Sequence, residues 1–112
     1  NEVMLKTTLF TLVFSATYLT TVQAASPELD GETLVQERYC YGCHNLTETL
    51  IGPSYQSIAT LHRARKDIMV EILANKIILG GAGNWGVVPM VPNEHVSMEE
   101  ARIIADWILN LE

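Results

Sequence analysis

Both cysteines of this 112-residue chain lie in one short run, Cys40-Tyr41-Gly42-Cys43-His44. Two cysteines cannot make a disulfide-rich scaffold, so the fold must be held together in another way. With only two Cys and three His in the chain, a C-x-x-C-H run is not expected by chance. The run therefore marks a functional site, and the rest of the fold has to accommodate it.

Three kinds of site could use this run. A thioredoxin-like redox pair needs a strand–helix context, which the sequence lacks, and gives the histidine no role. Half of a zinc site needs two more ligands, but His62 and His95 each stand apart from any other Cys or His. A c-type haem attachment uses every residue, because the two thiols add across the vinyl groups and His44 supplies the proximal imidazole. We favour the haem attachment and keep the other two as alternatives.

An iron bound by His44 has a second axial position, and five other side chains could occupy it: Met69, Met90, Met98, His62 and His95. We expect Met69 in the core, Met98 and His62 at the surface, and His95 at the surface or beside the site. Met90 differs because Pro89 and Pro92 flank it within the loop of residues 88–93. These prolines lower the conformational entropy that is lost when the loop orders a weak ligand. We predict Met90 as the second ligand, with an open position or His95 as the alternative.

Residues 1–24 have the features of a secretory leader. Lys6 provides the positive charge, residues 9–19 form an uncharged apolar run, and Val22-Gln23-Ala24 offers small residues to a signal peptidase. We expect cleavage after Ala24 and export to the periplasm, with residues 25–112 as the folded domain and no stable membrane insertion after cleavage. An uncleaved membrane anchor is the alternative, although the apolar run is shorter than the roughly 20 residues that span a bilayer.

The charge and the aromatic content limit what the domain can do. The chain carries 13 acidic and 7 basic side chains, a net charge of −6, whereas binding to nucleic acid needs clustered Lys and Arg. We therefore exclude nucleic acid as a partner. Both Phe residues, Phe10 and Phe14, belong to the leader, so the domain has a modest core. Small domains of this kind often recruit a cofactor for stability.

The spacing of apolar residues and helix breakers predicts an all-α domain of four or five short helices. A first helix opens at residue 30 or 31 and runs to about residue 41, with Leu34, Val35 and Tyr39 on related faces. Pro53 suits the first turn of a second, short helix. That helix carries three apolar residues: Tyr55, Ile58 and Ala59.

The second half of the chain predicts two more helices and a long loop. Apolar residues at i, i+4 spacing indicate a helix over about 65–79, which Gly80-Gly81 ends. Residues 80–93 are rich in glycine and proline and form a loop. Ser97 and Glu100 make a capping box that opens the last helix. Its apolar face contains Ala101, Ile104, Ala105, Ile108 and Leu111.

Taken together, the motifs resemble one known family. The matching segments are Cys40–His44, Ile-Gly-Pro at 51–53, Gly-Asn-Trp-Gly-Val-Val-Pro-Met-Val-Pro-Asn at 83–93, and a final helix with Trp107. In this combination the chain resembles the small bacterial single-haem class I cytochromes c. The resemblance implies a cytochrome c-like fold of short helices wrapped around one haem, which is bound covalently through thioethers of Cys40 and Cys43.

The resemblance also implies roles around the haem for four residues: Pro53, Asn93, Trp85 and Lys76. The Pro53 carbonyl would accept a hydrogen bond from the Nδ1–H of His44, and Asn93 would bond near the sulfur of Met90. Trp85 would donate its indole N–H to a haem propionate, which Lys76 would also face. Each of the four has a purely structural interpretation as well: respectively a helix start, a turn, a core position and a solvated helix face.

The expected activity follows from the predicted ligands. An iron bound by histidine and methionine in both redox states has no free position for oxygen or peroxide, so the chain is expected to carry single electrons and not to be an enzyme. Its partners would be redox proteins: a donor such as a quinol:cytochrome c reductase, and an acceptor such as a terminal oxidase or nitrite reductase. We expect a soluble periplasmic monomer. The alternative is a haem domain with a displaceable ligand, acting as a gas sensor or small haem enzyme.

Overall fold

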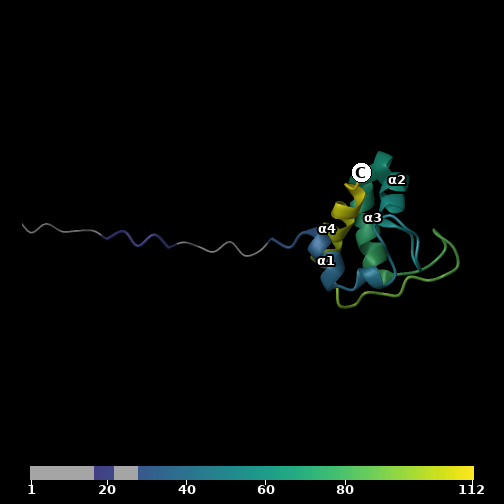
Figure 1. Cartoon of the computed structure of the whole chain (residues 1–112), viewed down its shortest axis with the longest axis horizontal. Coiled ribbons are helices and arrows are strands. Elements are labelled where there is room, and N and C mark those ends of the chain that lie inside the picture. Colours follow the sequence, from purple (N-terminus) through teal and green to yellow (C-terminus); the bar gives the residue numbers. More distant parts are fainter. Residues whose placement is uncertain (1–16, 22–27) are drawn as a thin grey trace, which may run out of the picture.

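The computed structural model describes residues 17–21 and 28–112, and Figure 1 shows how its helices are arranged. Residues 28–112 contain four α-helices and two short 3₁₀ turns, as expected for an all-α domain. These elements are α1 (Gly31–Glu37), η1 (Cys40–Gly42), α2 (Tyr55–His62), η2 (Arg63–Arg65), α3 (Lys66–Leu79) and α4 (Met98–Leu109). Extended pairing in the described residues is limited to one isolated bridge, between Gly81 and Met90.

The predicted leader, residues 1–24, lies largely outside the described residues, and its cleavage stays a prediction. Residues 17–21, which are described, contain no helix. Across residues 17–21 and 28–112, none of the helices has both the length and the apolar character needed to cross a membrane.

The core forms around α4, which contacts each of the other three α-helices. In Figure 1, α1 lies against α4, α3 lies beside it, and the C-terminal end lies near α2. Four of the five residues on the predicted apolar face of α4 are buried, together with Leu34 and Val35 of α1, whereas Leu111 lies beyond the end of the helix and is half-buried. The capping box also forms as predicted, since Ser97 accepts from the Glu100 N–H and the Glu100 carboxylate accepts from the Ser97 N–H. Burial of the four apolar helix faces is the main source of stability.

Helices α1 and α4 approach each other so closely that only glycine fits at the contact. A Cβ atom built on Gly31 would lie 2.1 Å from the Cβ of Trp107 and 3.1 Å from the carbonyl oxygen of Ile103. Real Cβ atoms essentially never come so close to other atoms, and a packed interior does not yield easily. Gly31 therefore sets the distance between the first and last helices of the domain.

The first helix ends earlier than the sequence predicts. Helix α1 stops at Glu37, and Tyr39 has left-handed backbone (φ 63°) with 82% of its surface exposed, so it does not share the buried face of Leu34 and Val35. The reason is tertiary: the Arg38 side chain pairs with Glu100, and the Arg38 carbonyl bonds to His95. These contacts hold the chain where it turns into η1.

The pair between Arg38 and Glu100 makes part of the stability depend on pH. The hydrogen bond that Glu100 accepts from Arg38 is the main reason that the pKa of Glu100 is lower in the folded protein than its usual value. A carboxyl with a lowered folded pKa stabilises the fold above its unfolded pKa, and this contribution disappears as the pH falls through the folded pKa. We expect Glu100→Gln to lower the free energy of unfolding by at most about 1 kcal/mol at pH 7, because the pair is near the surface.

That difference should shrink below about pH 4, where the carboxyl of the parent protein also becomes protonated. Urea unfolding of both proteins at several pH values measures it. Glu99→Gln is the matched control, because Glu99 is exposed on the same helical turn. A difference that stays constant from pH 7 to pH 3 would contradict the assigned role of the pair.

Of the two middle helices, α2 begins with a side-chain cap and α3 does not. The prediction that Pro53 lies in the first turn of α2 was wrong, because α2 begins at Tyr55. Ser54 caps α2 by accepting from the Ser57 N–H, so Pro53 precedes the cap. Helix α3 runs from Lys66 to Leu79, close to its predicted limits, and Gly80, whose φ of 66° suits glycine, follows it. The expectation of a solvated His62 was wrong: the side chain is half-buried and its Nδ1 has no hydrogen-bond partner. Burial, and then the charge of Arg65, lower the pKa of His62.

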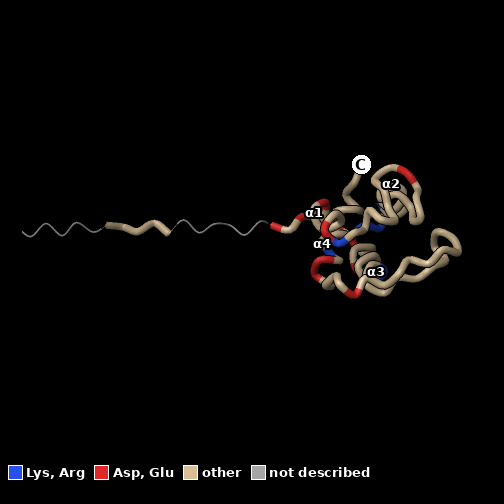
Figure 2. Tube along the Cα trace, turned by 60° about the horizontal axis from the view of Figure 1, so that its bottom comes forward, with Lys and Arg blue, Asp and Glu red and all other residues tan. Residues whose placement is uncertain are grey.

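Acidic residues lie near the start of α4 and three basic residues lie together at the α2–α3 junction, and Figure 2 shows the positions of charged residues along the chain. Near the start of the helix lie acidic residues that include Glu99 and Glu100. Beyond its end, Lys66 donates to the Asn110 side chain at 2.5 Å, and Arg63 donates to the Leu111 carbonyl at 3.3 Å. The basic residues of the α2–α3 junction thus hold the last residues of the chain against the domain.

Candidate functional site

The C-x-x-C-H run forms a single tight turn. Cys40 opens η1, and its carbonyl accepts hydrogen bonds from the N–H of Cys43 at 3.2 Å and from the N–H of His44 at 3.0 Å. Both thiols are free; that of Cys40 is half-buried, which raises its pKa, and that of Cys43 is exposed. Two thiols and one imidazole thus leave the same turn, and can bond to one group placed beside it.

The imidazole of His44 is held by the segment that precedes α2. Its Nδ1 lies 2.7 Å from the carbonyl oxygen of Pro53, and only 9% of the residue is exposed. The two chain segments are joined by a further bond, from the Gly52 N–H to the Cys43 carbonyl at 2.8 Å. Because a carbonyl can only accept, Nδ1 carries the proton, and Nε2 is left with a lone pair that can bind a metal.

One aromatic residue contacts this imidazole although no motif points to it. Tyr55, the first residue of α2, stacks on His44 with ring centroids 5.4 Å apart and an angle of 21° between the rings. The sequence places Tyr55 on the apolar face of a short helix, and it is indeed buried. Helical periodicity carries no signal for its contact with His44, because that contact depends on how the loop before α2 folds back.

The loop that carries Met90 is fastened at both ends to α3. Gly81 and Met90 exchange backbone hydrogen bonds of 2.8 and 2.9 Å, which close the loop between them. The Asn93 N–H donates to the carbonyl of Ile78, and the Asn93 side chain donates to that of Ile77 at 2.8 Å. Met90 is half-buried and packs against the core. The loop is therefore ordered by hydrogen bonds as well as by its prolines.

Two of the residues to which the resemblance gives a role, Asn93 and Lys76, lie at or beside this loop. Asn93 donates to the carbonyls of Ile77 and Val91, and its bond near the Met90 sulfur stays a prediction. Lys76 reaches from α3 to the start of the loop, since a Cβ built on Gly81 would lie 3.0 Å from its Nζ. Its contact with a propionate likewise stays a prediction.

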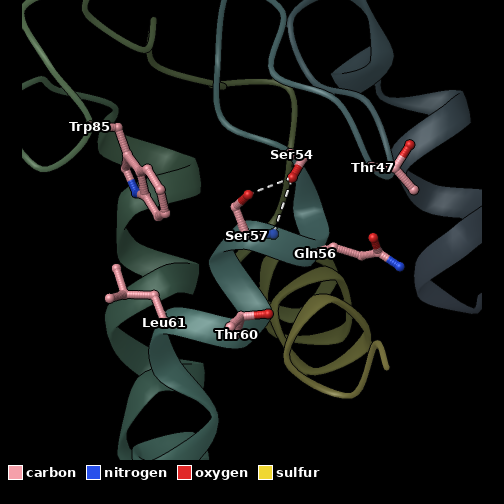
Figure 3. A pocket seen from close by; sticks show the side chains of 7 residues that line it. All are labelled: Thr47, Ser54, Gln56, Ser57, Thr60, Leu61 and Trp85. Atoms are coloured by element: carbon pink, nitrogen blue, oxygen red, sulfur yellow. Dashed lines mark hydrogen bonds between the residues drawn. The ribbon is translucent and has the colours of Figure 1, made fainter.

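Trp85 lies on an open pocket of about 490 Å³ and does not belong to the core, because 47% of its surface is exposed. Figure 3 shows its indole opposite Leu61, across from the hydroxyl groups of α2. Ser54 donates to Ser57 at 2.8 Å on that side. The residues that line the pocket are Thr47, Ser54, Gln56, Ser57, Thr60, Leu61 and Trp85.

Exposed apolar side chains lie in the segments that lead to Pro53 and surround Met90, and a large, mostly apolar group such as haem would cover side chains of this kind. The segments that lead to Pro53 and surround Met90 contain several apolar side chains with more than half of their surface exposed, which is unusual for a small domain. These are Leu50, Ile51, Val87, Val88 and Val91. Thiols, imidazole and thioether are also the donors that haem attachment and iron ligation require. The residues therefore fit the predicted group.

The other candidate ligands have structural positions. Met69 is buried in the core, as expected, and Met98 is half-buried against the core instead of lying at the surface. His95 is exposed, and its Nε2 lies 3.1 Å from the Arg38 carbonyl. In residues 17–21 and 28–112, no group of three or more His, Cys, Asp or Glu could hold a metal ion.

Known proteins similar to this chain include several small cytochromes c. The chain is 40% identical over 82 residues to cytochrome c-551 of Pseudomonas denitrificans, covering 73% of this chain and 98% of that protein. It is 42% identical over 82 residues to cytochrome c-552 of Hydrogenobacter thermophilus, covering 73% of this chain and 82% of that protein. No protein-family model matches the chain.

A solved structure agrees with these relatives. The crystal structure of wild-type Nitrosomonas europaea cytochrome c552 superposes with a TM-score of 0.69 and 40% identity, and covers 72% of this chain and 99% of that one. The helices described above therefore have the cytochrome c fold. From the identity of its relatives and the extent of the match, the chain belongs to the small class I mono-haem cytochromes c.

Proposed function

We propose that Cys40 and Cys43 bind one haem through thioethers, and that His44 Nε2 and Met90 Sδ are the axial ligands of its iron. The observation that carries this assignment is the 2.7 Å contact between His44 Nδ1 and the Pro53 carbonyl. It fixes the tautomer that leaves Nε2 unprotonated, and it makes the imidazole a stronger ligand. The closed loop around Met90 supports the second assignment, because a thioether is a weak ligand that binds well from an ordered loop.

The chain is an electron carrier and not an enzyme, as a member of this family. Its covalently bound haem supplies an iron that gains and loses one electron. The protein holds His44 and Met90 in place, so that little has to move when the charge changes. The comparisons give no support to a gas sensor or a haem enzyme.

The partners of such a carrier are other redox proteins. We propose that this chain works in the periplasm, with a quinol:cytochrome c reductase as donor and a terminal oxidase or nitrite reductase as acceptor. The predicted leader supports the location. The net charge of −6 supports docking through local apolar or lysine contacts near the site instead of through a broad positive face.

One absorption spectrum tests the ligands. We expect the oxidised protein to show a near-infrared charge-transfer band from methionine to iron, and the reduced protein not to bind carbon monoxide readily, because both axial positions are filled. Haem that stays with the chain on a denaturing gel tests the thioethers. Ready binding of carbon monoxide without the near-infrared band would favour the displaceable-ligand alternative.

A further inference from the structure

We propose that Tyr55 is a positioning residue: its ring fixes the plane of the His44 imidazole. The inference rests on the proposed function, since it matters only if His44 is an axial ligand. The plane of the axial imidazole decides which orbitals of the iron it overlaps, so a residue that fixes the plane affects the electronic state of the site.

The hydrogen bond to Pro53 cannot fix this plane alone. It holds Nδ1, but a hydrogen bond tolerates some bending of its N–H···O angle, so the ring can still turn about its Cβ–Cγ bond within that tolerance. Gly52 limits the rotation, because a Cβ built on it would lie 2.5 Å from His44 Cε1 and 2.8 Å from Nδ1. The Tyr55 ring, 5.4 Å from the imidazole and nearly parallel to it, supplies a flat surface along the ring itself. This centroid distance is within the range of favourable aromatic pairs.

Tyr55 can act in this way because it is itself held firmly. Only 2% of its surface is exposed. Its ring meets Trp107 edge-on at 5.4 Å and 75°, and meets Tyr41 edge-on at 5.7 Å and 69°. Its N–H donates to the Asn45 carbonyl at 3.0 Å. Because Trp107 also packs on Gly31, the contact between α1 and α4 is linked through Tyr55 to the imidazole.

The aromatic ring of Tyr55 fixes the plane of the imidazole, and its hydroxyl group takes no part in this. The hydroxyl is buried and has no hydrogen-bond partner, and burial raises its pKa strongly. An unpaired buried hydroxyl opposes folding, so the side chain is not explained by a polar contact. A phenylalanine would keep both the stacking and the packing, and is expected to replace Tyr55 without loss.

The test uses the haem-loaded protein and three variants. Tyr55→Phe keeps the ring, Tyr55→Met fills the space without a flat ring, and Met69→Leu changes a buried core residue of another helix, α3. Proton NMR of the oxidised protein reads the imidazole plane from the order and spread of the haem methyl resonances. We expect Tyr55→Met to change this pattern, with the near-infrared band retained, and the other two variants to keep the wild-type pattern.

Thermal unfolding separates positioning from stability. If Tyr55→Met lowers the melting temperature but leaves the methyl pattern unchanged, Tyr55 is only a core residue and the proposal is wrong. If Tyr55→Met does not fold, NMR of the reduced wild type decides, because stacking requires through-space signals between the ring protons of Tyr55 and His44, and their absence overturns the proposal. Absence of the near-infrared band in the wild type would instead refute the ligand assignment.

Discussion

Replacing Met90 with alanine is expected to abolish the near-infrared band and to lower the reduction potential by a few hundred millivolts, within the range of about 0.8 V that axial ligands control. A thioether favours ferrous iron, so its loss favours the ferric state. The loop itself should persist, because the bonds between Gly81 and Met90 use only backbone atoms. The measurements are near-infrared absorption of the oxidised protein and a potentiometric titration. Carbon monoxide should also bind readily to the reduced variant.

Two other methionines provide matched controls. Met69 is buried in α3, and Met98 is half-buried at the start of α4. Met69→Leu and Met98→Leu should keep both the band and the potential, although Met69→Leu can lower the stability by up to about 1.5 kcal/mol. Retention of the band in Met90→Ala would show that another side chain is the ligand. The control that lost the band would then identify it.

The second large effect is expected from Gly31→Ala, which should lower the free energy of unfolding by about 3 kcal/mol. The added methyl group would overlap the Cβ of Trp107, so α1 and α4 must move apart and loosen the core. The usual gain from alanine over glycine within a helix is about 0.5–1 kcal/mol and is too small to compensate. Chemical unfolding, followed by tryptophan fluorescence, measures the loss.

The position of the clash makes the expectation specific. Because the overlap involves the Cβ of Trp107, no substitution of Trp107 except glycine would relieve it. Gln36→Ala is the control, since Gln36 is exposed on the same helix, and we expect it to change stability by less than about 0.5 kcal/mol. Equal stability of Gly31→Ala and the parent protein would mean that α1 does not pack on α4 as described.

Features set by neighbouring residues could be predicted from the sequence, and features set by distant contacts could not. The capping box of Ser97 and the stop at Gly80 depend on a few residues in a row, and both were predicted correctly. The predicted end of α1 was wrong because the true end depends on contacts of Arg38 with Glu100 and His95, which lie far along the chain.

The same division applies to the candidate site. The motif places Cys40, Cys43 and His44 in one turn, and the structure has that turn. The stacking of Tyr55 on His44 has no counterpart in the sequence, because it arises only when the loop before α2 folds back on the motif. The roles of the individual ligands remain predictions, which the spectra and variants described above test.

The uneven distribution of charge around α4 has a consequence for how the protein meets a partner. Full negative charges lie near the start of the helix, and the basic residues of the α2–α3 junction lie beyond its end. These side-chain charges have the opposite sign to the partial charges of about half a unit at the two ends of α4, and they are larger. Because Arg63, Arg65 and Lys66 lie together while the chain as a whole carries a charge of −6, the domain carries its charge unevenly. In the field of a charged protein it experiences a torque that orients it before contact, and added salt weakens this torque.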